Sequence, residues 1–219
     1  VKDKRIVKMF KEITLLKSRS SYTDVLLSTD LINIKNLLLN TGYYFADVKT
    51  SMKTDVENNT INITYNINLG DKAKINKIVF VGDKKFKDRK LSNLIISEED
   101  RFWKFLSANI YLNKEKINLD KRLLENFYKN NGYYNVVIQE AFAEFEKDNF
   151  FKLIYNINAG DKYYFNNIKL ILPDDFDKKN FSKFYELVNS FKNKRYSLKK
   201  IEDLLNEIDK IALQKDYEF

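Results

Sequence analysis

The side chains that could do chemistry in this sequence are carboxylates, because the 219-residue chain contains no histidine and no cysteine. The commonest general base, the commonest metal ligand and the thiolate nucleophile are therefore missing. Acidic residues gather at Glu98, Glu99 and Asp100 and again at Asp174 and Asp175. Such groups can perform acid–base chemistry or bind a hard cation. Both fall in predicted loops without a glycine-shaped ligand loop, so we interpret them as solvated charge.

The sequence also lacks the common motifs of catalytic and nucleotide-binding sites. The chain contains no GxGxxG, Walker A, GxSxG or HExxH pattern. The single glycine of "VGDKKF" (81–86) predicts a strand-to-helix turn rather than a phosphate loop. The sequence therefore predicts a protein that is not an enzyme, with no catalytic residues, no cofactor and no metal site.

The net charge of +8 would suit an anionic partner such as nucleic acid, phospholipid or lipopolysaccharide. Basic and acidic residues alternate instead of forming a block, which favours a role in solubility. Tyr43, Tyr44, Tyr133 and Tyr134 could stack single-stranded nucleic acid, but their place after a helix-ending glycine favours packing over the helix. A basic nucleic-acid-binding α+β protein is the alternative from another class; the main interpretation expects no nucleic acid.

An internal repeat organises the chain. "YNINLGDK" (65–72) returns as "YNINAGDK" (155–162), and "GYYFADV" (42–48) returns as "GYYNVVI" (132–138), each displaced by 90 residues. Two separate landmarks with one spacing indicate a structural repeat. No apolar run approaches the roughly 20 residues of a membrane helix, and no signal peptide begins the chain. We expect a fragment cut inside a repeat.

The complete repeat is predicted at residues 71–160. Its elements are a strand (73–82), a helix (85–97), a helix (113–132) with Asn113 as N-cap and Gly132 as left-handed C′ residue, and two hairpin strands (133–145 and 150–160). In the last strand Phe151, Leu153, Tyr155, Ile157 and Ala159 fall on one face. The order β-α-α-β-β predicts an α+β fold of tandem modules, each a three-stranded mixed sheet with two helices on one face.

The flanking modules are predicted to be partial. Residues 1–70 supply two helices (2–13 and 24–41) and a hairpin (43–55 and 60–69), so their first strand would precede residue 1. Residues 161–219 supply a strand (163–172), two helices (180–191 and 197–215) and the opening of a strand (216–219), so their hairpin would follow. The linkers are short and carry no Pro/Ser-rich spacer, which predicts a semi-rigid array of modules.

An exposed sheet edge is the candidate binding site. A three-stranded sheet has two edge strands, and an edge offers unpaired N–H and C=O groups to another extended chain. The long, proline-free strand 133–145 is the predicted binding edge for another extended chain, and a neighbouring module or loop covering it is the open alternative. The candidate residues are Tyr134, Val136, Val137, Ile138, Glu140 and Phe142.

The connection 98–113 carries more large apolar groups than loops usually hold, among them Phe102, Trp103 and Phe105. We favour packing of this connection against the helices of its own module. The alternative is a docking loop, in which Trp103 is the best candidate for exposure. Structural turn roles are predicted for four glycines: Gly42, Gly82, Gly132 and Gly160.

These motifs, taken in order, resemble the POTRA repeats of the BamA family of outer-membrane β-barrel assembly factors. A strand ends in Val81-Gly82, a helix ends in Phe127-Tyr128 before Gly132-Tyr133, and a last strand ends at Gly160 before Tyr163. The "FWKFLS" stretch is similar to the third repeat, which makes the flanking parts the second and fourth. Two features depart from the pattern: Asn158-Ala159 replaces the usual acidic residue, and "LLLNTGYY" replaces the usual helix ending. The resemblance leaves one alternative open within the family, a TamA-like translocation and assembly factor or another POTRA protein such as a division protein with one such domain.

The resemblance implies a periplasmic array at the outer membrane of a Gram-negative bacterium, preceding the parent's own C-terminal β-barrel, which is absent from this chain. The implied partners are unfolded outer-membrane proteins and accessory lipoproteins. Client strands share an alternation of apolar and polar residues but differ in their individual side chains. A receptor should therefore bind their backbone, which an open edge strand does by β-augmentation.

Overall fold

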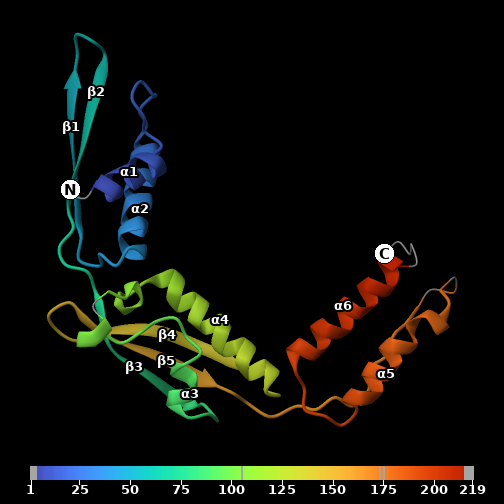
Figure 1. The fold of residues 1–219 in the computed structure, drawn as a ribbon. Coiled ribbons are helices and arrows are strands. Elements are labelled where there is room, and N and C mark those ends of the chain that lie inside the picture. Colours follow the sequence, from blue (N-terminus) through green and yellow to red (C-terminus); the bar gives the residue numbers. More distant parts are fainter. Residues whose placement is uncertain (1–3, 105, 173, 175, 215–219) are drawn as a thin grey trace. The chain divides into compact units, whose positions relative to one another are not determined.

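The computed structural model describes residues 4–104, 106–172, 174 and 176–214, together with the backbone but not the side chains of Glu140 and Ala212 (Figure 1). Its internal contacts divide the chain into two units, which are considered separately. Unit 1 holds Val1–Val79, Ile96–Leu119 and Phe142–Ile154, and unit 2 holds Phe80–Ile95, Asp120–Ala141 and Tyr155–Phe219. Within the described ranges, no helix combines the length and apolarity needed to cross a membrane.

The N-terminal part of unit 1 consists of two helices and a hairpin. The elements are α1 (Lys4–Ile13), α2 (Asp24–Asn40), β1 (Asp47–Asp55) and β2 (Thr60–Asn68). Thr23 caps α2 by accepting a hydrogen bond from the N–H of Leu26. β1 and β2 pair antiparallel without interruption, from Asp47 opposite Asn68 to Asp55 opposite Thr60. These elements agree with the predicted order of two helices and a hairpin.

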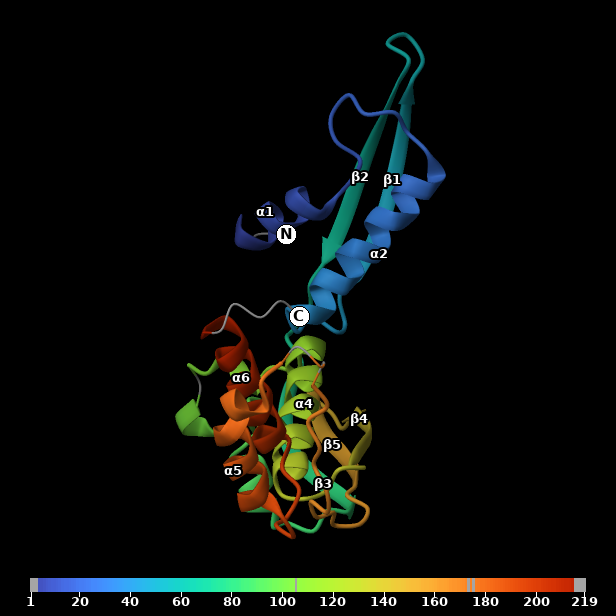
Figure 2. The same cartoon turned by 90° about the vertical axis from the view of Figure 1, so that its right-hand side faces the viewer.

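A small core joins the helices to the hairpin. Ile6, Phe10, Ile34 and Leu38 are buried, and Tyr65 and Ile67 of β2 are among the half-buried residues that pack on them. Both views place α2 alongside the β1–β2 hairpin (Figures 1 and 2). The alternation of apolar and polar residues in β2 therefore directs one of its faces toward the helices.

The remaining strands form a three-stranded sheet. They are β3 (Lys74–Asp83), β4 (Val137–Phe145) and β5 (Phe150–Asn158), in the spatial order β3-β5-β4. The N–H of Lys74 donates to the Asn149 oxygen, and the N–H of Ala159 donates to the Asp83 oxygen. Both ends of β3 thus lie beside the corresponding ends of β5, so the two strands run parallel. The short connection between β4 and β5 makes those two strands antiparallel, and the sheet is mixed as predicted.

Two helices accompany this sheet: α3 (Asp88–Ser92) and α4 (Lys114–Asn130). The side-chain oxygen of Asn113 accepts from the N–H of Lys116 at 2.8 Å and caps α4. At the other end, the N–H of Tyr133 reaches the Tyr128 oxygen and that of Gly132 the Lys129 oxygen, which is the Schellman arrangement. The predicted helix 85–97 was too long, because the chain turns away at Asn93 and the β-branched Ile95 and Ile96 follow.

The core of this sheet lies on the predicted face of β5. Phe151, Leu153, Tyr155, Ile157 and Ala159 are all buried. In unit 2, the Phe80 ring stacks on the Tyr155 ring with centroids 5.5 Å apart, and Leu124 and Tyr128 of α4 are fully buried. Figures 1 and 2 both show α4 running along one face of the strands.

The C-terminal part of unit 2 is helical. A 3-10 turn, η3 (Lys178–Phe181), precedes α5 (Ser182–Phe191) and α6 (Leu198–Gln214). The predicted strand 163–172 was wrong: these residues form only an isolated bridge between Tyr164 and Arg195. Ile168 and its alternate neighbours still pack on the core of Phe181, but the described residues provide no strand to pair with them. The expected strand opening at 216–219 lies outside the described residues.

Candidate functional site

The edge strand β4 begins later than the sequence indicated. The structure starts it at Val137 rather than residue 133, because residues 133–136 complete the turn that follows α4. Val136 is buried, and its N–H donates to the Tyr133 oxygen at 3.3 Å. The Tyr134 ring packs edge-on against the Tyr163 and Tyr196 rings. Tyr134 and Val136 were therefore wrongly placed on the strand.

The other candidate residues lie on β4 itself. Val137 and Phe142 are about half exposed, whereas Ile138 is buried. The side chain of Glu140 lies outside the described residues. β4 is a border of the sheet, with β5 on its inner side. In the part of the chain that the structure describes, no strand pairs with its outer side.

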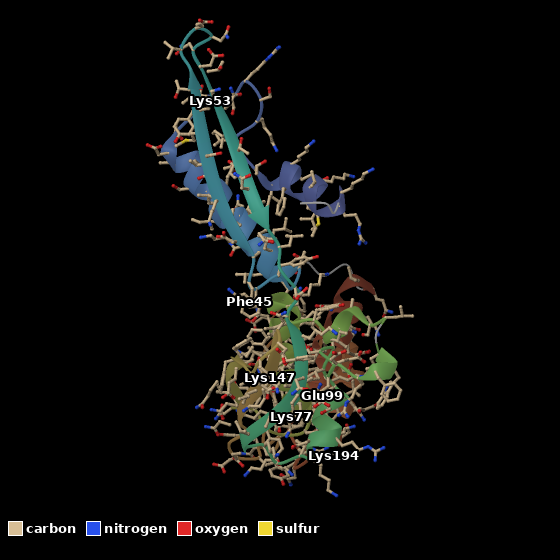
Figure 3. The ribbon with its side chains drawn as sticks, turned by 90° about the vertical axis from the view of Figure 1, so that its left-hand side faces the viewer. Phe45, Lys53, Lys77, Glu99, Lys147 and Lys194 are labelled. Carbon is tan, nitrogen blue, oxygen red and sulfur yellow. The ribbon has the colours of Figure 1, made fainter. Side chains whose placement is uncertain are left out.

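The opposite border of the sheet is occupied by the chain itself. The N–H of Asp100 donates to the Ile75 oxygen at 2.7 Å, and the N–H of Ile78 donates to the Glu99 carboxylate at 3.0 Å. Glu99 lies close to β3, near Lys77 (Figure 3). The segment 98–113 therefore satisfies backbone groups along the first half of β3, and the two borders of the sheet are not equivalent.

The acidic group of this segment braces the loop, so its interpretation as solvated charge was wrong. The hydroxyl of Ser107 donates to Glu98 at 2.7 Å, and this bond, followed by Lys104, lowers the pKa of Glu98. Burial raises the pKa of Glu99, but hydrogen bonds from Ile78 and Arg101 outweigh it and hold the pKa below its usual value. Within the described ranges, no three acidic side chains come close enough to hold a metal ion. Asp175 lies outside the described residues.

β4 carries a β-bulge. On one face of the hairpin, Lys152 pairs with Glu144 at 2.5 Å, and the Asn156 amide donates to Gln139 at 3.3 Å. Lys152 and Asn156 are four residues apart, whereas Glu144 and Gln139 are five apart. Residues on one face of a strand are separated by even numbers, so β4 contains one extra residue between these contacts. The β1–β2 pairing has no such interruption.

Beyond the bulge, the direction of the free backbone groups follows from one hydrogen bond. The N–H of Glu146 donates to the Phe150 oxygen at 2.9 Å, and thus points toward β5. Alternate residues of an antiparallel strand direct their backbone groups inward and outward. Phe145 and Ala143 therefore present N–H and C=O groups to the outer side of β4.

An aromatic cluster lies at this end of the strand. The Phe145 ring meets the Phe45 ring at 5.5 Å and the Phe151 ring at 5.4 Å, and Tyr44 meets Phe151 at 5.8 Å. Phe45 and Phe145 remain about half exposed, and Figure 3 shows Phe45 at the base of the β1–β2 hairpin. The sequence interpretation missed this cluster. Tyr44, in the repeated Gly-Tyr-Tyr motif, was the only available signal, because Phe45 stands where the second copy has Asn135.

The connection 98–113 divides into a buried and an exposed part. Ile110 and Leu112 are buried, whereas Phe102 is 87% exposed and Trp103 is 60% exposed. The two aromatic rings touch each other edge-on at 4.6 Å. The favoured prediction, packing against the helices of the module, was therefore wrong for Phe102 and Trp103. Phe105 lies outside the described residues.

Comparison with known proteins identifies the architecture. A family model for POTRA, described as surface antigen variable number repeat, matches residues 1–70 and 73–160. The chain belongs to the POTRA family. The crystal structure of POTRA3-5 of Haemophilus influenzae BamA has the same fold, with a TM-score of 0.54 at 16% identity over 93% of this chain and 79% of that one. The recognition of POTRA repeats and the predicted α+β fold are confirmed.

The curated relatives of this POTRA chain include outer membrane protein assembly factors. BamA of Buchnera aphidicola is 28% identical over 202 residues, which cover 90% of this chain and 31% of the relative. BamA of Neisseria meningitidis is 30% identical over 99 residues, which cover 45% of this chain and 12% of the relative. The chain thus spans less than a third of the length of these relatives.

Proposed function

We propose that this chain is a periplasmic, non-enzymatic scaffold of an outer-membrane protein assembly machine. Its membership of the POTRA family and its similarity to factors named for that assembly support the proposal. Residues 1–70, 71–160 and 161–219 are taken as successive modules, the first and last partial. The site of action is the periplasmic face of the outer membrane, next to the parent's own β-barrel. No cofactor takes part.

Unfolded β-barrel proteins are the proposed clients, and β4 is the proposed receptor strand. The observation that carries this choice is the difference between the two borders of the sheet. Segment 98–113 bonds to β3 at Ile75 and Ile78, whereas β4 directs the backbone of Ala143 and Phe145 outward. An extended client can therefore add a strand at β4 by backbone hydrogen bonding.

The bulge limits how tightly a client can be held. One extra residue in β4 interrupts the ladder between Gln139 and Glu144, so only the short stretch after it is regular. The half-exposed Phe45 and Phe145 lie at that stretch and can accept apolar client side chains. Weak, reversible pairing suits a protein that must release its clients.

Accessory lipoproteins are the proposed partners of the exposed loop. Phe102 and Trp103 are exposed and belong to segment 98–113, which bonds to the outer edge of β3 through Asp100. A docked partner there would leave β4 accessible. Exposed aromatic side chains are frequent anchors of protein interfaces.

Proline substitution at Ala143 tests the receptor strand. Ala143→Pro removes one outward N–H and should weaken binding of a peptide copied from an amphipathic barrel strand by about tenfold. Ala143→Val keeps the N–H and should bind like the unmodified chain. Isothermal titration at two salt concentrations provides the measurement. Equal affinity of both variants for the peptide, with unchanged circular dichroism, would show that β4 is not the receptor strand.

A further inference from the structure

The chain builds one type of joint twice, once within each unit. In each joint, a linker residue donates its backbone N–H to the oxygen of the glycine that ends the preceding helix. A residue just before the next long helix then donates its N–H to the oxygen of that same linker residue. The bonds of the first joint are Ala73 N–H to Gly42 O at 2.8 Å and Leu112 N–H to Ala73 O at 3.0 Å; those of the second are Tyr163 N–H to Gly132 O at 2.8 Å and Tyr196 N–H to Tyr163 O at 2.9 Å. Equivalent backbone geometry makes the side chains of the two joints directly comparable.

The two joints differ in charge. At the first joint, a cavity of about 430 Å³ is lined by two lysines and two aspartates, Lys72, Lys74, Asp71 and Asp148 among others. At the second joint, a cavity of about 420 Å³ is lined by four cations and no carboxylate, with Asn130, Tyr164 and Ser197 completing the wall. The four cations are Lys162, Lys194, Arg195 and Lys200, of which Figure 3 labels Lys194.

The side-chain stems of two of these cations lie side by side. A Cβ placed on Gly132 would lie 2.6 Å from Cγ of Arg195 and 3.0 Å from Cγ of Lys162, so both stems converge on the space that glycine leaves. The Lys162 ammonium lies over the Tyr133 ring, 5.4 Å from its centroid. The side-chain stems of an arginine and a lysine thus meet beside Gly132.

Neighbouring carboxylates do not neutralise the cluster. Asp161 and Glu202 are close in sequence, but neither lines the cavity. Among the described residues, none of the four cations has a carboxylate within ion-pair distance. Asn130 accepts hydrogen bonds from the Ser197 hydroxyl at 3.2 Å and from the Lys199 N–H at 2.7 Å, and thereby fixes the start of α6 beside the end of α4. These hydrogen bonds thus hold in place the backbone next to the cations.

We propose that this cavity binds a phosphate-type oxyanion, either a free phosphate or the phosphate of a lipid headgroup. The planar guanidinium of Arg195 can donate two parallel hydrogen bonds to such a group, and the lysines add charge and single donors. The volume exceeds that of a phosphate ion, so an esterified phosphate with part of its alcohol also fits. The first joint, with its paired aspartates, does not bind the same ligand.

Phosphate titration at constant ionic strength tests the site. Amide chemical shifts of Gly132 and Arg195 should change saturably with sodium phosphate and not with the equivalent sodium chloride. Arg195→Gln and Lys162→Met should each weaken the apparent affinity about tenfold, because each removes a charge-assisted contact. Lys72→Met at the first joint is the matched control and should leave the affinity unchanged. Arg195→Lys keeps the charge but not the planar guanidinium, and it replaces Arg195→Gln in the titration if the glutamine variant does not fold.

Vesicles separate the two sources of phosphate. Co-sedimentation with phosphatidylglycerol vesicles, but not with phosphatidylcholine vesicles, and its loss in Arg195→Gln, would identify the headgroup as ligand. Saturation by inorganic phosphate without co-sedimentation would identify the free ion. Neither response in the unmodified chain, or an equal loss in Lys72→Met and Arg195→Gln, would overturn the proposal.

Discussion

The hydroxyl of Tyr155 donates a 2.6 Å hydrogen bond to the carboxyl group of Asp120, whose side chain is fully buried. Ninety residues earlier, the hydroxyl of Tyr65 makes the same bond to the buried Asp30 at 3.1 Å. A buried carboxyl group requires such donors to offset its lost hydration. The pair joins a strand to the long helix in each repeat, and the 90-residue spacing of both partners was its signal in the sequence.

Removing the hydroxyl of Tyr155 should destabilise the fold. Tyr155→Phe leaves Asp120 without this donor, so the free energy of unfolding should fall by about 2 kcal/mol. Tyr185→Phe, at a partly exposed position of α5, should change it by less than about 0.5 kcal/mol. Denaturant unfolding followed by circular dichroism measures both. A Tyr155→Phe variant as stable as the control would show that the bond contributes nothing.

The equivalent Tyr65 predicts a loss of stability at high pH. Burial, followed by the hydrogen bond to Asp30, raises the pKa of Tyr65 from 10.0 to about 12. Below pH 10 the tyrosine is protonated in both the folded and the unfolded chain, and its contribution to the free energy of unfolding is fully present. Between pH 10 and 12 the unfolded chain releases the proton first, so this contribution is progressively lost. Unfolding free energy should fall more steeply there for the unmodified chain than for Tyr65→Phe; parallel curves would contradict the assignment.

Two glycines should respond differently to alanine. Gly82 has φ +83°, and a Cβ there would lie 2.4 Å from the Ile157 oxygen, whereas Gly160 has φ +65° and no atom within 4 Å of that position. Gly160→Ala should cost about 1 kcal/mol for its left-handed backbone alone. Gly82→Ala should cost about 3 kcal/mol, because the strands must also separate. Thermal unfolding compares the two, and similar losses would mean that β3 and β5 do not approach so closely.

The loop aromatics should be dispensable for folding. Phe102→Ser combined with Trp103→Ser should change the unfolding free energy by less than about 0.5 kcal/mol, since both side chains are exposed. Ile110→Ala, in the buried part of the same connection, should cost about 2–4 kcal/mol. Chemical denaturation of the three chains provides the comparison. A clear destabilisation of the double variant would show that these rings pack in the fold.

The sequence predicted elements where local pattern and tertiary packing agree. The single apolar face of β5 and the Asn113 cap of α4 are examples, because alternation and capping are local properties. The start of β4 was misplaced, because β-branched Val136 reads as strand while its N–H closes a turn on Tyr133. The strand predicted at 163–172 kept its alternation, with Ile168 packed inward, but a strand also needs a partner.

The inequality of the two sheet borders could not be predicted in the same way. It depends on Glu99 and Asp100 reaching Ile78 and Ile75 across more than 20 residues, and no local pattern records such a contact. The bulge in β4 is similar, because it appears only when the partners of Lys152 and Asn156 are compared. The sequence therefore indicated the edge at 133–145 but not that segment 98–113 bonds along the opposite border of the sheet.

Amide hydrogen exchange with and without an unfolded barrel-strand peptide tests the central claim most directly. The outward amides of Ala143 and Phe145 should exchange at least about tenfold more slowly when the peptide is bound, while the Ile78 amide, already bonded to Glu99, should not change. Protection at β3 with no change at β4, or no protection at either border while the peptide is bound, would contradict the account.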